Sequence, residues 1–403
     1  MAFRVSSTIV CRSNSQIGIT ISLSHDGSVY SLGKHSKRGH GHEEELVDIP
    51  TKIPTLKNIK SFDCGHFHSI FLDSNGSVYT LGGNSKGQLG IQKTRKQLPF
   101  THLPQKIDIP PAKQVGAGVY FSICITEGGD VFSFGDHGYA QCGVGYEEEQ
   151  FSSPQHLTSV KDIDFAACGA NFVICKTMDE RIIVWGNNDC GQLGMPHPDV
   201  QNAPYSPSNW VKDTIVDIKC GDSHTLVLTS TGEVYYCGFT YHRQLGVGAF
   251  PDDPLLVNPT KISSLSGIKR IECGSNHSLC IDSEGNLFCF GKNYSGQLGL
   301  LDTEPKKDPI EHPTLSDVID VSSRGNHTFV KTSSNKIFGF GMNFFGQLSV
   351  KTNDDTQLEP IEVFQDKEYI WCSKINSTAK SARSISDRPE SDNQTPKKIQ
   401  KIE

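Results

Sequence analysis

A 27-residue stretch at positions 273–299, CGSNHSLCIDSEGNLFCFGKNYSGQLG, recurs along the chain and constrains its fold more than any other feature. Other copies begin at Cys64, Ala117, Cys168, Cys220 and Ser323, with a degenerate first copy near Ser15. The glycine that ends the second apolar run of each copy recurs every 49 to 53 residues, at Gly33, Gly82, Gly135, Gly186, Gly238, Gly291 and Gly341. Self-similarity at one fixed period is typical of solenoids and propellers. We therefore expect seven equivalent units in one domain.

Each unit has the pattern of short strands joined by tight turns. An alternating run such as residues 59–64 precedes a glycine, and an apolar run such as 69–72 follows it. A glycine turn, Asn75-Gly76 in this copy, then leads into a third apolar run. Two β-rich runs around such a turn predict a hairpin. Segments that begin with proline, at 50–53, 104–107 and 259–262, are typical of an edge strand, where a missing N–H is tolerated.

Four strands per unit indicate a propeller blade. The sequence therefore predicts an all-β, seven-bladed β-propeller of four-stranded blades over residues 1–372. An open ring would leave two sheet edges exposed. We expect the ring to close by pairing of N- and C-terminal strands, near residues 3–11 and at 360–363 and 369–372. The polar segment 373–403 has too few apolar residues to offset the entropy of ordering, so it is predicted to be a disordered tail.

Three columns of the repeat have structural explanations. The glycine column, where a tight turn needs positive φ, holds Gly87, Gly191, Gly296 and Gly346. The next column holds amides that can bind backbone groups of the loop: Gln88, Gln141, Gln192, Gln244, Gln297 and Gln347. A third column holds His68, His224, His277 and His327, and other copies carry Phe121, Phe172 and Ile19 there. Because that column accepts apolar residues, we interpret these histidines as buried and hydrogen-bonded across blades.

Apparent catalytic motifs do not survive alignment of the repeats. Residues 83–87 match the G-x-S-x-G nucleophile elbow, but Ser85 aligns with Asp189, so the column holds no consistent nucleophile. His35, His40, His42 and the glutamates after them lack the spacing of a metal site and are interpreted as a solvated loop. The sequence therefore predicts a protein that is not an enzyme and that uses no cofactor and no metal.

Cysteine usage and charge narrow the class further. The chain has 13 cysteines, an odd number, and several occupy one repeat column, so we expect reduced, buried thiols. No signal peptide and no run of about 18 apolar residues is present. We therefore expect a monomeric protein of the cytoplasm, the nucleus or both, without a membrane contact. A net charge of -7 argues against a general nucleic-acid binder.

The repeat resembles that of the regulator of chromosome condensation family, whose units read G-x-x-H-S/T-x-x-L-x-x-x-G-x-V/L-Y/F-x-x-G-x-N-x-x-G-Q-L-G. The resemblance covers residues 1–372 and implies a seven-bladed propeller. It also implies a non-enzymatic interaction protein, most concretely a guanine-nucleotide exchange factor or regulator for a Ran-like small GTPase. If the chain exchanges nucleotide, residues 144–153 are the candidate probing segment. The alternative is an adaptor for a larger ubiquitin-ligase, ciliary or chromatin complex without exchange activity.

Candidate partner-binding residues lie where the copies differ. They are acidic or aromatic residues of the variable loops: Glu43, Glu44, Glu45, Glu147, Glu148, Glu149, Tyr205 and Trp210. Aromatic residues favour interfaces, although each stretch can also be a plain solvated loop. Contact with histones or DNA needs a basic extension, and basic residues are few at both ends of the chain. A tryptophan-based photoreceptor is disfavoured because Trp185, Trp210 and Trp371 are far apart in repeat order.

Overall fold

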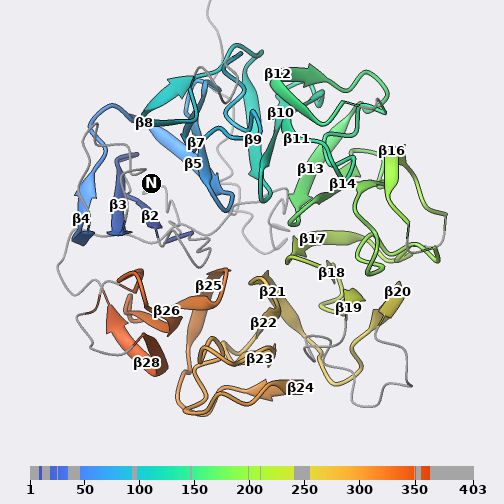
Figure 1. Cartoon of the computed structure of the whole chain (residues 1–403). Coiled ribbons are helices and arrows are strands. Elements are labelled where there is room, and N and C mark those ends of the chain that lie inside the picture. Colours follow the sequence, from blue (N-terminus) through green and yellow to red (C-terminus); the bar gives the residue numbers. More distant parts are fainter. Residues whose placement is uncertain are drawn as a thin grey trace, which may run out of the picture.

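The described part of a computed structural model is entirely β-strand, turn and loop. It comprises residues 9–10, 19–24, 26–34, 46–92, 98–145, 148–197, 199–208, 210–239, 255–348, 350 and 355–363. These residues form seven antiparallel sheets, each of four consecutive strands, and Figure 1 shows the sheets as blades around a central axis. The structure confirms the predicted seven-bladed propeller.

The strands of blades 1 to 4 are β1 (Ile9–Val10), β2 (Ile19–Leu23), β3 (Val29–Lys34), β4 (Leu46–Lys52), β5 (Ile59–Cys64), β6 (His68–Asp73), β7 (Val78–Gly83), β8 (Phe100–Lys106), β9 (Ala112–Ala117), β10 (Phe121–Thr126), β11 (Val131–Asp136), β12 (Gln150–His156), β13 (Ile163–Cys168), β14 (Phe172–Thr177), β15 (Ile182–Gly186) and β16 (Gln201–Tyr205). Those of blades 5 to 7 are β17 (Ile215–Cys220), β18 (His224–Thr229), β19 (Val234–Phe239), β20 (Leu255–Lys261), β21 (Ile268–Cys273), β22 (His277–Asp282), β23 (Leu287–Gly291), β24 (Lys306–Glu311), β25 (Val318–Arg324), β26 (His327–Thr332), β27 (Ile337–Met342) and β28 (Thr356–Val363).

The first strand of each blade lies nearest the axis and the fourth lies at the rim (Figure 1). The first strand of blade 2, β5, has the predicted bounds 59–64. The rim strands begin earlier than predicted: β8 starts at Phe100, so Pro104 lies within it. Pairing with the third strand shifts register just before the glycine of that strand, between Thr80 and Gly82 in blade 2. The strand thus continues past the proline as a bulged edge.

Among the described residues, the sheet order contains no pairing between the two ends of the chain. Strand β1 pairs with β2 and β28 pairs with β27, so within the described residues each terminal blade consists of four consecutive strands. The first and last blades are joined by a buried hydrogen bond, in which Thr20 Oγ1 donates to the Gln347 carbonyl over 2.7 Å. The ring closes at the described residues by packing between blades. The predicted strand at 369–372 and the tail at 373–403 lie outside the described residues.

Hydrophobic clusters between neighbouring blades hold the ring together. One cluster combines Phe172 and Leu193 of blade 4 with Ile218 of blade 5, and another combines Leu298 of blade 6 with Phe340 of blade 7. Both leucines follow the glutamine of the repeat and are fully buried. Burial of apolar surface stabilises by about 25 cal/mol per Å², so adjacent blades stabilise one another.

The glutamine column binds its own loop, as predicted. In five blades the amide oxygen accepts from the backbone N–H two residues earlier at 2.8 to 2.9 Å; the acceptors are Gln88, Gln141, Gln192, Gln297 and Gln347. Gln244 lies outside the described residues. The backbone carbonyl of the same residue also accepts from the next blade, for example from Thr225 Oγ1 to Gln192 at 2.7 Å. One residue type therefore orders a loop and links two blades. The adjoining turn glycines, Gly87, Gly191, Gly296 and Gly346, have φ of 70 to 78°.

The four histidines of the repeat are buried, and three bond to a hydroxyl of the next blade. His68 Nε2 lies 2.7 Å from Ser122 Oγ, His224 Nε2 lies 3.2 Å from Ser278 Oγ, and His277 Nε2 lies 3.0 Å from Thr328 Oγ1. His327 is buried as well. The prediction of packing positions with bonds across blades is confirmed for His68, His224 and His277.

Candidate interaction surfaces

The antiparallel order of the strands places two kinds of connection on opposite faces of the ring. Connections between the first and second strands, and the longer ones between the third and fourth, emerge on one face, which we call the loop face. The glycine turns between the second and third strands emerge on the other face. Sequence variation between the copies is concentrated in the loop-face connections.

A charge cluster joins blades 2 and 3 on the loop face. Lys86 Nζ lies 2.9 Å from Asp136 Oδ1, and Gln141 Nε2 donates to Asp136 Oδ2 over 2.9 Å. The hydrogen bond that Lys86 donates to the Asp136 carboxylate raises the pKa of Lys86 despite partial burial, with a smaller contribution from Glu149. The backbone N–H of His137 donates to the Glu149 carbonyl over 2.8 Å, which fixes the start of β12 beside Asp136. We call Lys86, Asp136 and Glu149 the blade 2–3 charge cluster.

A stacked aromatic pair flanks this cluster. The rings of Phe67 and Tyr120 lie 4.6 Å apart at an interplanar angle of 9°, and both residues are half-buried. The Tyr120 carbonyl accepts from the Asp136 backbone N–H over 2.9 Å. Burial, followed by the carboxylate of Asp136, raises the pKa of Tyr120, so the phenol stays neutral. An aromatic surface beside charged groups resembles the composition of protein interfaces.

The predicted acidic candidates are only partly described. Glu148 and Glu149 are exposed immediately before β12, and Glu149 belongs to the blade 2–3 charge cluster. Glu147 and the run Glu43, Glu44 and Glu45 lie outside the described residues. Sequence reasoning singled out the glutamates but missed Lys86, Asp136, Phe67 and Tyr120. The sequence did contain a signal for the aromatic pair. Blades 2 and 3 carry Phe67 and Tyr120 in a column that holds asparagine or serine in the four blades that follow.

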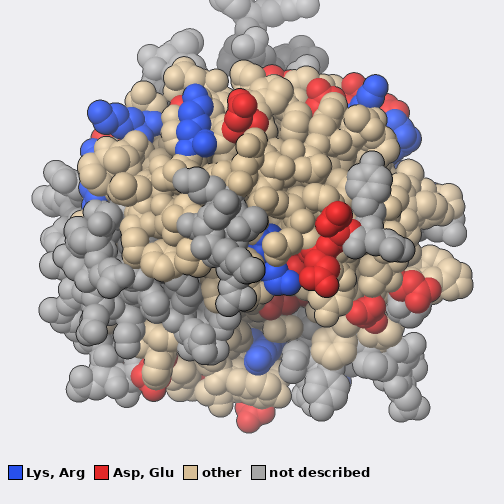
Figure 2. Space-filling model, turned by 45° about the horizontal axis from the view of Figure 1, so that its top comes forward, with Lys and Arg blue, Asp and Glu red and all other residues tan. Residues whose placement is uncertain are grey.

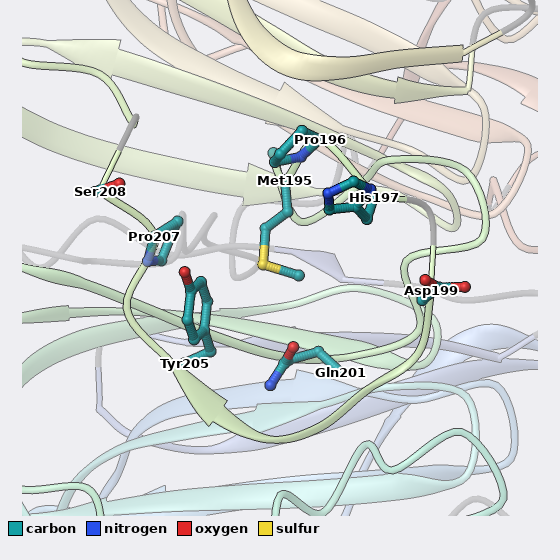
Figure 3. Close-up of a pocket in the computed structure, with 9 residues that line it drawn as sticks. Met195, Pro196, His197, Asp199, Gln201, Tyr205, Pro207 and Ser208 are labelled. Carbon is teal, nitrogen blue, oxygen red and sulfur yellow. The ribbon is translucent and has the colours of Figure 1, made fainter.

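A small pocket lies at the rim of blade 4. Its volume is about 270 Å³, and it lies between the loop at Gly194–His197 and the end of β16. In Figure 3 the side chains of Met195, Tyr205 and Gln201 point into the same space. Tyr205 keeps 48% of its surface exposed, as expected of a contact residue. We call this site the blade 4 rim pocket.

Trp210 was predicted as a contact residue, but the structure places it in the core. Only 7% of its surface is exposed, and its Nε1 donates to the Leu193 carbonyl over 3.0 Å. It packs in the cluster between blades 4 and 5. His312 has the equivalent place in blade 6, with Nε2 3.1 Å from the Gly299 carbonyl. Buried residues recur just after the rim strands, as at Ile107 and Ile262, so alignment of the repeats could have identified Trp210 as a packing residue.

Groups that could perform covalent chemistry are buried or unassembled within the described residues. The eleven described cysteines are free, and all except Cys190 are buried. Burial raises the pKa of the Cys289 thiol to about 12, which keeps it protonated and unreactive. The described residues contain no group of three His, Cys, Asp or Glu side chains placed to hold a metal ion, and none forms a helix long and apolar enough to cross a membrane. The turn at residues 83–87 is not followed by a helix.

Charges are dispersed on the face shown in Figure 2. Lysine and arginine occur there in small groups beside acidic residues, and they do not merge into one basic surface. Such a distribution does not favour binding to a phosphate backbone, which needs clustered cations.

Comparison with known proteins identifies the repeat. Residues 7–262 match the RCC1-like domain, and residues 268–297 and 284–330 match the regulator of chromosome condensation (RCC1) repeat. The probable E3 ubiquitin-protein ligase HERC4 of Rattus norvegicus is 32% identical over 67% of this chain. This chain spans only 31% of that relative. The ultraviolet-B receptor UVR8 of Arabidopsis thaliana is 29% identical over 72% of this chain and 67% of its own length.

Solved structures show the same fold. Prp20p of Saccharomyces cerevisiae, described with its binding to Gsp1p and histones, has a TM-score of 0.71 at 19% identity. That match covers 89% of this chain and 87% of the other. Human WBSCR16 has a TM-score of 0.70 at 24% identity, covering 82% of this chain and 87% of the other.

Proposed function

Because this chain belongs to the RCC1 repeat family of propellers, we propose that it is a binding protein that regulates a Ran-like small GTPase, most concretely by promoting nucleotide exchange. The observation that carries the proposal is the loop-face surface of blades 2 and 3. There the blade 2–3 charge cluster, the Phe67–Tyr120 pair and the exposed Glu148 lie together. Prp20p, which has this fold, is described with its binding to Gsp1p.

The chemistry of this surface suits a partner that holds a phosphate ligand. A GTPase binds its nucleotide through Mg²⁺, a lysine and backbone N–H groups, all of which attract anions. Exposed carboxylates at Glu148 and Glu149 can compete with the nucleotide phosphates for those positive groups. The Phe67–Tyr120 pair supplies apolar area for docking, and no group on this chain needs to form a covalent bond. Exchange would thus come from binding alone.

A nucleotide-release assay tests the proposal. The full chain is added to purified Ran-like GTPases loaded with fluorescent GDP, and release is compared with the spontaneous rate. We expect an acceleration of at least about tenfold, lost when Glu148→Lys and Glu149→Lys are combined, because the carboxylates become cations that repel the phosphate-binding groups. Glu284→Lys, which changes an exposed acid of the opposite face, should keep the activity. Release at the spontaneous rate with every GTPase would refute exchange.

A second candidate function is that of a targeting module. The HERC4 match covers the repeats but only 31% of that ligase, which favours recognition of a partner by the propeller as part of a larger assembly. Affinity capture with mass spectrometry separates the two functions. Recovery of one small GTPase favours exchange or regulation, whereas recovery of a ligase, ciliary or chromatin complex favours the adaptor. Retention on nucleosomes, compared with and without residues 373–403, tests histone or DNA contact.

A further inference from the structure

We propose that the blade 4 rim pocket binds a short extended segment of a partner protein that carries an apolar or aromatic side chain next to a lysine or arginine. This site lies at the rim, between the Gly194–His197 loop and the end of β16 (Figure 3). It uses none of Lys86, Asp136 or Glu149, so it would be independent of the proposed GTPase contact.

The size of the pocket indicates a side chain as its occupant. About 270 Å³ is below the range of roughly 300–1,000 Å³ that drug-sized ligands occupy. Met195 forms an apolar floor, with only 8% of its surface exposed. Tyr205 keeps 48% of its surface exposed. A large ring that is half-exposed over an apolar floor can bury more area when a partner covers it. Tyrosines in such positions are enriched among the residues that dominate binding energy.

The walls of the pocket are held in place before any partner arrives. Pro196 and Pro207 line it, and the proline ring fixes the backbone φ, so little entropy is lost on binding. The carbonyl of His197 accepts from Asn188 Nδ2 over 2.6 Å and from the Asp199 backbone N–H over 3.0 Å. These bonds fasten the loop that carries the lining residues to the core of blade 4.

The adjacent strand edge favours recognition by side chains over addition of a strand. Pro204 lies in β16 and has no N–H to donate. Gln201 Nε2 donates over 2.7 Å to the carbonyl of Ala203, which would otherwise be open to a partner strand. The missing N–H of Pro204 and the occupied carbonyl of Ala203 weaken strand addition at this edge, so the pocket is the stronger source of affinity.

The negative charge of the pocket explains why the proposed segment carries a lysine or arginine next to its anchoring side chain. Asp199 lines the pocket, is exposed, and has no ion pair within the part of the chain that the structure describes. The other polar groups of the lining are neutral hydroxyl and amide groups together with the His197 ring. A lysine or arginine beside the anchoring side chain can pair with Asp199 at the rim, whereas an acidic neighbour would be repelled.

Selection from a phage-displayed library of random peptides on the immobilised full chain tests this proposal. Synthetic peptides from enriched clones are then titrated by fluorescence polarisation. We expect an apolar or aromatic residue within two positions of a lysine or arginine. Tyr205→Ala should weaken binding at least about tenfold, Asp199→Lys should weaken it through repulsion, and Ser208→Arg should block the pocket. Tyr294→Ala, which removes a tyrosine with 58% exposure on another blade, should change nothing.

The controls keep the outcomes distinct. The variants alter exposed side chains, so their unfolding transitions should match that of the unmodified chain, which circular dichroism checks. Enriched peptides that lack a basic residue, that bind Tyr205→Ala as tightly as the unmodified chain, or that depend on Tyr294 would overturn the proposal. Failure to enrich any peptide would also count against it.

Discussion

Three buried imidazoles of the repeat are held neutral by their surroundings. Burial lowers the pKa of His224 to about 4 and those of His277 and His327 to about 3. The pKa in the unfolded chain is close to the ordinary value of 6.5. Below that pH the unfolded state binds protons that the folded state refuses. The free energy of unfolding is therefore highest above pH 6.5. It decreases as the pH falls from 6.5 toward the pKa of these rings in the folded protein.

We predict that acidification unfolds the propeller steadily between about pH 6.5 and about pH 4. Each ring should lower the free energy of unfolding by about 1.4 kcal/mol per pH unit in this window, because one extra proton binds to the unfolded chain. Urea titrations across this range, followed by tryptophan fluorescence, measure the slope. A free energy of unfolding that does not change with pH would contradict the prediction.

The matched variant is His277→Phe. Phenylalanine already fills this column at Phe121 and Phe172. The two hydroxyls that face His277 keep other acceptors, since Thr328 Oγ1 donates to the Gln297 carbonyl and Ser323 Oγ donates to the His327 carbonyl. The variant should fold and should reduce the pH slope by about one proton.

At the scale of residues, the sequence allowed us to predict that the repeated histidines and glutamines are structural. It did not allow us to predict their hydrogen-bond partners in the next blade. A column that holds both histidine and phenylalanine must be buried, and a glutamine beside a turn glycine can bind its own loop. Which atom each histidine or glutamine meets in the next blade depends on how two blades pack, and that is not encoded at one position. Trp210 was misassigned because it was considered by residue type and not by its place after a rim strand.

At the scale of elements, the rim strands share a device that blunts their outer edges. Every rim strand contains one proline: Pro50, Pro104, Pro154, Pro204, Pro259, Pro309 and Pro360. In five of them the carbonyl just before the proline accepts from a side chain of the same strand at 2.7 to 3.1 Å; the donors are Gln105, Gln155, Gln201, Thr260 and Gln357. Missing donors and occupied acceptors protect an edge from pairing with another chain.

We predict that giving one rim strand a backbone N–H donor and a more accessible carbonyl acceptor causes self-association of the protein. Combining Pro104→Thr with Gln105→Ala gives β8 an N–H at position 104 and removes one of the two side-chain donors to the Leu103 carbonyl, which accepts from Gln105 Nε2 over 3.1 Å and from Thr101 Oγ1 over 2.8 Å. The exposed Leu103 adds an apolar contact. Light scattering coupled to size exclusion should show concentration-dependent oligomers, while the melting temperature changes little because the substitutions are on the surface.

Gln105→Ala alone is the control for this prediction, and it should associate less, because Pro104 still lacks the donor. A double variant that elutes as the unmodified chain does at every concentration would mean that the edge is protected by something else.

The sequence predicted the strands of a blade unequally well. The inner strands follow the alternation of apolar residues. In blade 2 the first strand has the predicted bounds, and the second, β6, extends one residue beyond the predicted 69–72 at each end. The rim strand was placed four residues late in blade 2 because its proline was read as a beginning, whereas the register shift at Gly82 lets the strand start at Phe100. A bulge is a property of pairing, and one strand taken alone does not reveal it.

At the scale of the whole molecule, an ion pair crosses the ring between blades 7 and 2. Arg324 Nη2 lies 3.1 Å from Asp63 Oδ1, and both side chains are at most 5% exposed. Burial lowers the pKa of Arg324, but the carboxylates of Asp63 and Glu272 outweigh it and raise the pKa overall. Asp63 also accepts from the backbone N–H of Ala117 in blade 3 over 2.9 Å. This pair links the last blade to the second and third across the first.

We predict that Arg324→Gly destabilises the propeller by about 3–5 kcal/mol, because it leaves the buried Asp63 carboxylate without its cation. Glycine is the residue of this column in five other blades, at Gly65, Gly118, Gly169, Gly221 and Gly274, so the backbone accepts it. Combined with Asp63→Ala, the loss should be smaller than the sum of the two single losses. Guanidinium titrations of the four proteins measure the coupling, and additive losses would show that the pair contributes nothing.

Closure of the ring is the part of the fold that the repeat pattern constrains least. The repeat fixes the number of blades and their internal order, but the seam depends on residues outside the pattern. Arg324 stands where the repeat has glycine, and its partner Asp63 lies 261 positions away. Loop-face surfaces were equally hidden, because the residues that form them come from different blades.

The span of that ion pair has a consequence for how the protein is made. A ribosome adds about 5–20 residues per second, so the 261 positions between the two partners take about 13–50 s to synthesise. Through that interval Asp63 can be hydrated or held by nearby backbone, but its cation does not yet exist. The early blades must therefore persist as an open arc, exposing apolar faces, until the seventh blade leaves the exit tunnel. Translation speed and chaperone supply over that stretch should set the yield of closed rings.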